Sequence, residues 1–404
     1  MDKYWLYLEP YVFVFKNKDK AILYNTINSS CIDVVENSEI FAVLEKMRDV
    51  SNGYCVKIDS TFFDSDNNRQ FIKILRETYS GDIEVVTLNN KKPFIISPSL
   101  LVYNNFLKER RANIPIRSRS IVRNIFEVNI YIGAECGLNC AGCNSYYKQT
   151  IHCTDFYCGN LSYGDYKRIF SMINTYKIPT VNILGGDILK YDKIFLLMDF
   201  ISQLDFKPRI YICDKNIDFD LLKKMMNYNF NIEILFHTPF DWEYINGLLL
   251  DNVNFNFIVD DEADLKIIGE CDCLKTRPFN VYPVYNGDNI DFFKKYVFLN
   301  KNDITRTRID KKTIYRRSVI NDNFFGKLIL LPNGDVYSNM NSEKRIGNIL
   351  QMSFGEIAYK EISEGDYWLR TRDFGVCEDC VYKLLCPSIS NYELFLNREN
   401  LCQL

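Results

Sequence analysis

The stretch Cys136-Gly-Leu-Asn-Cys140-Ala-Gly-Cys143 is the most informative part of this 404-residue sequence. It comes directly after the apolar run Phe126–Ile132, which predicts a β-strand, so the three cysteines fall in the loop at the C-terminal end of that strand. In parallel α/β sheets, ligands bind at this end of the strands. Three thiolates at this spacing can hold three irons of a [4Fe–4S] cube and leave the fourth iron an open position.

A zinc ion is the alternative occupant of this loop. Zinc normally takes a fourth protein ligand. His152, Cys153 and Cys158 lie just beyond the loop and are able to supply one. The cysteine motif by itself therefore leaves both metals open.

Strand-like and helical segments alternate after the cysteine loop. The predicted strands are Thr180–Leu184, Arg209–Ile212, Ile232–Phe236, Asn254–Val259 and Phe279–Tyr285, and the predicted helices are Ser162–Tyr176, Tyr191–Leu204 and Ile217–Tyr228. Repeated strand–helix units predict a parallel sheet with right-handed crossovers. About six units are fewer than the eight of a closed barrel. The expected fold class is therefore α/β, with a partial (β/α)6 barrel.

A cysteine triplet of this spacing after the first strand of a partial barrel resembles the radical SAM superfamily. The resemblance implies that the open iron chelates S-adenosylmethionine (SAM) and that reductive cleavage yields a 5′-deoxyadenosyl radical. Gly185-Gly186-Asp187, at the end of the second predicted strand, is similar to the family's Gly-Gly-Glu motif and is expected to bind SAM. Gly142 departs from the family, in which an aromatic residue near the adenine often precedes the third cysteine. Tyr146 or Tyr147 is the expected replacement.

A second cysteine group lies near the C-terminus, at Cys377, Cys380, Cys386 and Cys402. Four thiolates close either a zinc site or an iron–sulfur cluster without an open position. Together with the predicted hairpin Leu331–Tyr337, the region resembles the SPASM or twitch extension of radical SAM peptide maturases. The resemblance implies an auxiliary [4Fe–4S] cluster, the second in the chain.

Two further cysteines of a full SPASM domain are replaced in this sequence. Their positions correspond to Asn339 and Ser390. The resemblance therefore implies that only one auxiliary cluster remains.

The first hundred residues predict a small α+β unit of three short strands followed by helices. It is similar to the winged-helix leader-recognition domain of ribosomal-peptide maturases. Such a domain implies that a leader peptide adds as a strand beside Ser30–Val35, against the helix Arg69–Tyr79. The expected division is a leader-recognition module at 1–92, a linker at 93–122, the radical SAM barrel at 123–300, a connector at 301–326 and the auxiliary-cluster domain at 327–404.

Composition narrows the setting in which the protein works. The formal net charge of -3 gives no reason to expect a nucleic-acid partner. The sequence has no run long enough to span a bilayer and no signal-peptide pattern, so we expect a cytoplasmic protein with no membrane partner. Fourteen cysteines in that reducing compartment favour metal ligands over disulfides.

The sequence as a whole predicts a radical SAM maturase that modifies a ribosomally made peptide. The expected partners are a precursor peptide, bound through its leader, and a reductase or a flavodoxin- or ferredoxin-type electron donor. Two alternatives stay open: a SPASM enzyme that acts on a folded protein, and a degenerate, non-catalytic relative that only binds peptide.

Overall fold

The computed structural model describes most of the chain. The described residues are 2–36, 38–49, 51–87, 91–93, 118–133, 135–140, 142–156, 158–228, 230–248, 253–271, 274, 275 and 277–404. The predicted linker over residues 93–122 lies largely outside them. Among the residues described, no helix combines the length and the apolar character needed to cross a membrane.

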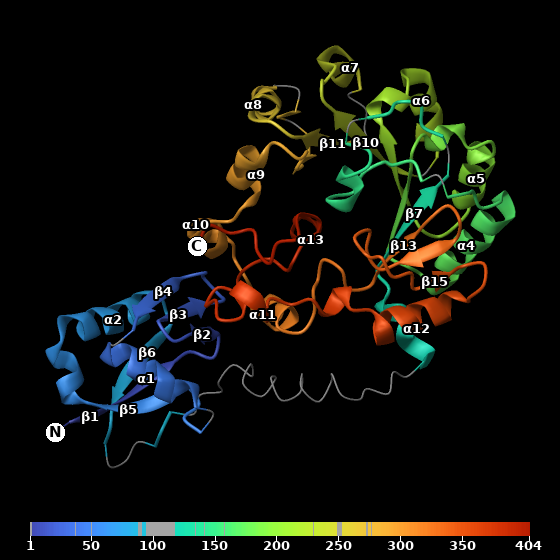
Figure 1. Cartoon of the computed structure of the whole chain (residues 1–404). Coiled ribbons are helices and arrows are strands. Elements are labelled where there is room, and N and C mark those ends of the chain that lie inside the picture. Colours follow the sequence, from blue (N-terminus) through green and yellow to red (C-terminus); the bar gives the residue numbers. More distant parts are fainter. Residues whose placement is uncertain are drawn as a thin grey trace.

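A nine-stranded sheet in the order β12-β11-β10-β9-β8-β7-β13-β14-β15 is the largest sheet of the described chain, and Figure 1 shows its strands on the inner side of the surrounding helices. Its first six strands in the chain are β7 (Glu127–Ile132), β8 (Thr180–Gly185), β9 (Arg209–Cys213), β10 (Asn231–His237), β11 (Val253–Val259) and β12 (Phe279–Pro283). Each of these strands pairs in parallel with the next. The predicted mixed α/β class with a large parallel sheet is confirmed, and the C-terminal ends of all six strands lie at one end of this sheet.

Helices connect the parallel strands. They are α4 (Tyr163–Tyr176), α5 (Ile194–Ile201), α6 (Phe219–Met226), α7 (Trp242–Gly247) and α8 (Glu262–Glu270). Four of them begin at a side chain that accepts a hydrogen bond from a backbone N–H of the first turn: Ser162, Asp218, Asp241 and Asp261. These N-caps replace hydrogen bonds that the first turn of a helix lacks, and they explain where the helices begin.

Both faces of the parallel part of the sheet carry buried apolar side chains. On β9, Ile210 and Ile212 pack toward the helices, whereas Tyr211 and Cys213 belong to a second buried cluster on the opposite face. This alternation follows from the two-residue period of a strand. Parallel sheets are normally covered on both faces, and the second face here lies beneath the cysteine loop.

The C-terminal part of the chain continues the same sheet. The predicted hairpin is confirmed as β13 (Lys327–Leu330) and β14 (Asp335–Tyr337), followed by β15 (Gly347–Asn348). Gly334 in its turn has a φ of 86°, which favours glycine. The sequence did not predict that β13 pairs in parallel with β7. The remaining helices are α9 (Ile290–Val297), α10 (Lys301–Arg306), α11 (Lys311–Arg317), α12 (Phe354–Glu364) and α13 (Asn391–Leu396).

The N-terminal part forms two three-stranded sheets, β5-β1-β6 and β2-β3-β4. Its elements are β1 (Lys3–Leu8), β2 (Val12–Lys16), β3 (Lys20–Asn25), β4 (Cys31–Val35), α1 (Glu39–Arg48), β5 (Cys55–Asp59), α2 (Asp66–Glu77) and β6 (Gly81–Val85). Strands β1 and β5 were missing from the prediction. The helix that contacts β4 is α1, while α2, the predicted partner of that strand, contacts β6.

One face of the β2-β3-β4 sheet packs against the C-terminal part of the chain, which Figure 1 shows in orange and red beside the blue strands. Phe13 and Tyr24 are fully buried there with Ile314 and Leu385. Asp33 on β4 accepts hydrogen bonds from Lys301 at 2.6 Å and from the Tyr382 hydroxyl at 3.1 Å. The N-terminal part is therefore joined to the C-terminal part of the chain by a buried apolar contact and by hydrogen bonds to Asp33.

Candidate functional site

The three cysteines of the loop after β7 lie at the C-terminal end of the parallel strands. Cys136, Cys140 and Cys143 are all half-buried. The next segment of chain fixes the loop, because the Cys136 N–H donates to Asp155 Oδ2 at 2.9 Å and the Thr154 hydroxyl donates to the Cys143 carbonyl at 3.0 Å. These two hydrogen bonds tie both ends of the loop to residues 154 and 155.

These cysteines share one open cavity of about 190 Å³. Its wall also contains Gly186 from the loop after β8 and Cys213 from the end of β9. A neighbouring cavity of about 190 Å³ shares Leu138 and Cys140 with the first. Residues at the ends of β10, β11 and β12 also line it: His237, Ile258 and Val284. The two cavities lie next to each other along the strand ends, beside the cysteine loop.

The donor set of the loop fits an iron–sulfur cluster. Thiolates are the usual protein ligands of such clusters. In a cluster, irons and sulfides lie between the ligating sulfurs, so the sulfurs stand farther apart than around a single ion. Among the described residues, the groups of ligand atoms that lie within 4.8 Å of one another do not include the three loop cysteines as a set. In this structure the three loop sulfurs therefore do not lie as close together as the ligands around one ion.

The Gly185-Gly186-Asp187 segment lies at the end of β8, beside this cavity. A Cβ at Gly185 would collide with the Ile132 carbonyl oxygen of β7 and the Ile188 side chain, so this glycine allows close packing. Asp187 is buried, with Oδ2 at 3.5 Å from Lys190 Nζ, and no hydrogen-bond partner for Oδ1 is found in the described part of the chain. A buried carboxylate oxygen without a partner suits a cationic amino group of a ligand.

Tyr146 fills the space that a side chain at position 142 would take. A Cβ added at Gly142 would overlap the Tyr146 ring. The Tyr146 hydroxyl donates to Asp260 Oδ2 at 3.2 Å, which fixes the ring at the wall of the second cavity. Burial, with the charge of Asp260 adding to it, raises the pKa of Tyr146 well above its usual value. Position 142, directly before Cys143, is a glycine. The Tyr146 ring, three residues after Cys143, occupies the space beside it.

The four tail cysteines also lie together. Cys377 and Cys386 are buried, and Cys380 and Cys402 are half-buried. Burial raises the pKa of Cys386 to about 12 against the opposing charge of Arg372, and the other three thiols are close enough to add to the rise. Cys402 is brought to the group from the end of the chain by a β-bridge to Leu299.

Arg372 is the charged neighbour of this tail group. Its guanidinium pairs with Glu393 at 2.7 Å, donates to the Pro387 carbonyl at 2.7 Å and reaches Cys377 Sγ at 3.8 Å. The Arg372 and Glu393 side chains are only 10% and 2% exposed. A buried cation beside Cys377 and Cys386 stabilises the thiolates that a metal or cluster needs.

Asn339 and Ser390, at which the sequence analysis expected two cysteines of a full SPASM domain to be replaced, belong to a hydrogen-bonded group. Asn339 is buried and donates to Asn391 Oδ1 at 2.7 Å. Ser390, next to Asn391, forms a capping box with Glu393 at the start of α13. Both side chains therefore form hydrogen bonds within the protein.

A buried group of histidine, cysteine and aspartate side chains beside the loop was missed by the sequence analysis. Its members are His152, Cys153, Cys213, Asp214 and His237. The sequence analysis named His152 and Cys153 only as candidate fourth ligands of the loop, and it did not connect them with Cys213, Asp214 or His237. Cys153 and Cys213 are both buried. The available signal was their position, because Cys213 and His237 end two adjacent parallel strands and the chain has only two histidines.

Comparisons with known proteins give structural neighbours of low identity. No family model matches the sequence, and no curated protein matches it. Three crystal structures of SuiB from Streptococcus suis are similar over nearly the full chain. One is of SuiB itself, at 16% identity and a TM-score of 0.45, covering 98% of this chain and 100% of that one. The SuiB structure bound to S-adenosylmethionine has 16% identity and a TM-score of 0.44, with 99% and 100% covered. The SuiB structure bound to the precursor peptide SuiA has 15% identity and a TM-score of 0.41, with 94% of each covered.

Proposed function

We propose that this protein is a radical SAM enzyme that modifies a ribosomally made peptide. The observation that carries the proposal is that Cys136, Cys140 and Cys143 share one cavity with Gly186 at the C-terminal ends of parallel strands. The partnerless Oδ1 of Asp187 lies at the same end of the sheet. A partial (β/α)6 barrel and a reducing, cytoplasmic location are part of the proposal.

The residues of the loop have separate tasks in this proposal. The three cysteines hold three irons of a [4Fe–4S] cluster, which together with SAM supplies a 5′-deoxyadenosyl radical when bound. Gly185, Gly186 and Asp187 receive the amino end of SAM. The Tyr146 ring, held by Asp260, provides the flat apolar surface on which an adenine packs.

The tail is proposed as a twitch-like domain with one auxiliary [4Fe–4S] cluster on Cys377, Cys380, Cys386 and Cys402. As with the loop cysteines, these four thiols are not among the groups of ligand atoms found within 4.8 Å in the described residues. Four thiolates close such a cluster without an open position. A flavodoxin- or ferredoxin-type protein or a reductase is the proposed electron source.

The leader of the precursor peptide is proposed to bind at β4, in the module at residues 1–92. In the described residues, β4 pairs only with β3, so its other edge is open. Glu36 N donates to the Asp19 carbonyl, and Asn25 N donates to the Ser30 carbonyl. In an antiparallel pair, every second residue of a strand points its N–H toward the partner strand, and the residues between point theirs away. The register of β3 and β4 therefore places the N–H groups of Asp33 and Val35 on the open edge. An added strand needs such donors.

Anaerobic reconstitution followed by a test for 5′-deoxyadenosine examines the proposal directly. The wild-type protein should cleave SAM under reduction, and Cys140→Ala should not. Cys55→Ser, a buried thiol in the N-terminal part, is the matched control and should cleave SAM as the wild type does. A wild-type protein that holds iron and binds peptide without cleaving SAM would instead support the non-catalytic alternative.

A further inference from the structure

The end of β9 and the end of β10 bring three different metal-binding side chains together. Cys213 is the last residue of β9, Asp214 follows it, and His237 is the last residue of β10. All three are buried, with exposures of 1%, 8% and 7%. They come from neighbouring parallel strands, so the sheet itself fixes their relative position.

The distances within this group match those around a single ion. Cys213 Sγ lies 3.4 Å from Asp214 Oδ1 and 3.6 Å from His237 Nδ1, and the Asp214 oxygen lies 3.8 Å from the same nitrogen. With a metal–sulfur distance of about 2.3 Å and metal–nitrogen and metal–oxygen distances of about 2.0–2.2 Å, the ligand–ligand edges of a tetrahedron are roughly 3.3–3.6 Å. The group needs to close by only a few tenths of an ångström to hold such an ion.

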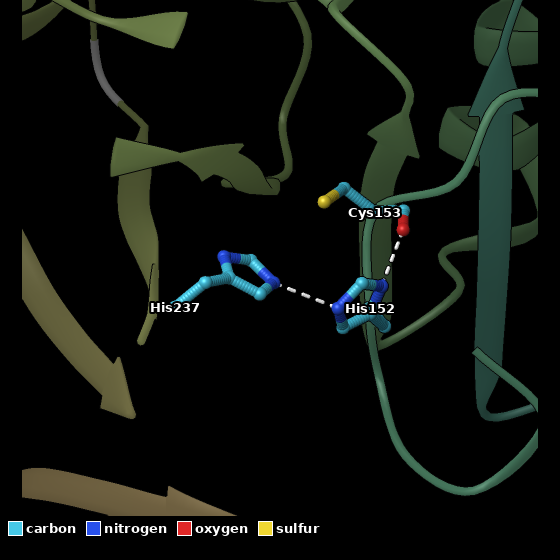
Figure 2. A group of neighbouring side chains, drawn as sticks. All are labelled: His152, Cys153 and His237. Atoms are coloured by element: carbon cyan, nitrogen blue, oxygen red, sulfur yellow. Dashed lines mark hydrogen bonds between the residues drawn. The ribbon is translucent and has the colours of Figure 1, made fainter. Parts of the chain in front are cut away.

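The second nitrogen of His237 is held by an independent chain of hydrogen bonds. Its Nε2 lies 2.7 Å from His152 Nε2, and His152 Nδ1 contacts the Cys153 carbonyl oxygen. A carbonyl only accepts, so His152 carries its proton on Nδ1 and accepts at Nε2, and His237 is the donor between the rings. Figure 2 shows this chain from His237 through His152 to Cys153.

This hydrogen bond sets the tautomer that a metal requires. With its proton on Nε2, a neutral His237 presents the lone pair of Nδ1 to Cys213 and Asp214. Metal-ligating histidines almost always donate their other ring N–H to a fixed acceptor in this way. His152 is buried to 1% exposure and therefore acts as that acceptor without competition from bulk water.

We infer that Cys213, Asp214 and His237 form a site for a single zinc-like divalent ion, separate from the cysteine loop and the tail. Mixed sulfur, nitrogen and oxygen ligands of this kind are the ones that zinc takes. Cys213 lines the cavity of the cysteine loop and His237 lines the adjoining one, so the fourth position lies beside both cavities. Water or the neighbouring Cys153 thiol is the ligand for that position.

Elemental analysis of the iron-loaded full-length protein tests this inference, because iron then occupies the other clustered cysteines. The protein should be incubated anaerobically with zinc and freed of excess by gel filtration. Wild type and the Cys55→Ser control should hold about one tightly bound zinc per chain. Cys213→Ser and the isosteric Asp214→Asn should lose it with iron content unchanged. His152→Phe should weaken zinc binding by roughly 10–100-fold in competition with a chromophoric chelator, because phenylalanine has no acceptor to orient His237.

Two results would overturn the inference. One is a wild-type protein without zinc, or with zinc that both variants retain. The other is loss of iron in parallel with zinc, which would assign Cys213 to the iron–sulfur site. Neither result depends on SAM cleavage, so the zinc site and the proposed function succeed or fail separately.

Discussion

Replacing Arg372 by methionine should strongly destabilise the tail, because it leaves the Glu393 carboxylate buried and unpaired. The two side chains are 10% and 2% exposed and lie 2.7 Å apart. Breaking a buried ion pair from one side costs about 3–5 kcal/mol. The same change also removes the donor to the Pro387 carbonyl. We therefore expect the free energy of unfolding to fall by about 3–5 kcal/mol.

Anaerobic urea unfolding of the iron-loaded proteins, followed by circular dichroism, measures this loss. Arg370→Met is the matched control, because its pair with Asp366 is exposed and should contribute at most about 1 kcal/mol. The double variant Arg372→Met/Glu393→Gln removes the unpaired charge and should regain roughly half of the loss. The reasoning is refuted if Arg372→Met is as mild as Arg370→Met, or if the double variant regains nothing.

Three further predictions concern separate parts of the chain. Burial, with Asp366 adding to it, raises the pKa of Glu361 to about 8 from 4.5. Its protonated form is thus favoured on folding, so stability should fall as pH rises from about 5 through 8, and Glu361→Gln should flatten this dependence of the melting temperature. Gly142→Phe should cost about 1–3 kcal/mol by overpacking against Tyr146 and weaken SAM binding, measured by calorimetry, and Tyr146→Ala in the same chain should recover part of both. Val35→Pro removes an N–H of the open β4 edge and should weaken leader binding, measured by fluorescence anisotropy, without unfolding the protein; equal binding by this variant would argue against strand addition.

The parallel sheet was predictable because its signals are local. Each of its strands is a short apolar run, and turn residues and helical periodicity separate them, as between Thr180–Gly185 and Arg209–Cys213. Strands β1 and β5 were not predictable in the same way. They pair across about fifty residues of sequence, for example Lys3 with Asp59, and no local pattern reports that contact.

The same distinction between local and long-range signals applies to the candidate site. Cys136, Cys140 and Cys143 lie within eight residues of sequence, so their spacing alone predicts a shared ligand. Cys213 and His237 become neighbours only through the pairing of β9 with β10, and His152 reaches them from another loop. A search of strand ends for sulfur and imidazole side chains would have found the first two, whereas the position of His152 requires the folded chain.

The most direct test of the central claim is electron paramagnetic resonance of the reduced cluster at Cys136, Cys140 and Cys143. Changing Cys377, Cys380 and Cys386 together to Ala removes the proposed tail cluster and should leave about four irons per chain. The account predicts that SAM shifts the spectrum of this remaining cluster, because SAM binds at the iron that the protein leaves open. A spectrum unchanged by saturating SAM, or stoichiometric zinc in place of iron at the loop, would contradict it.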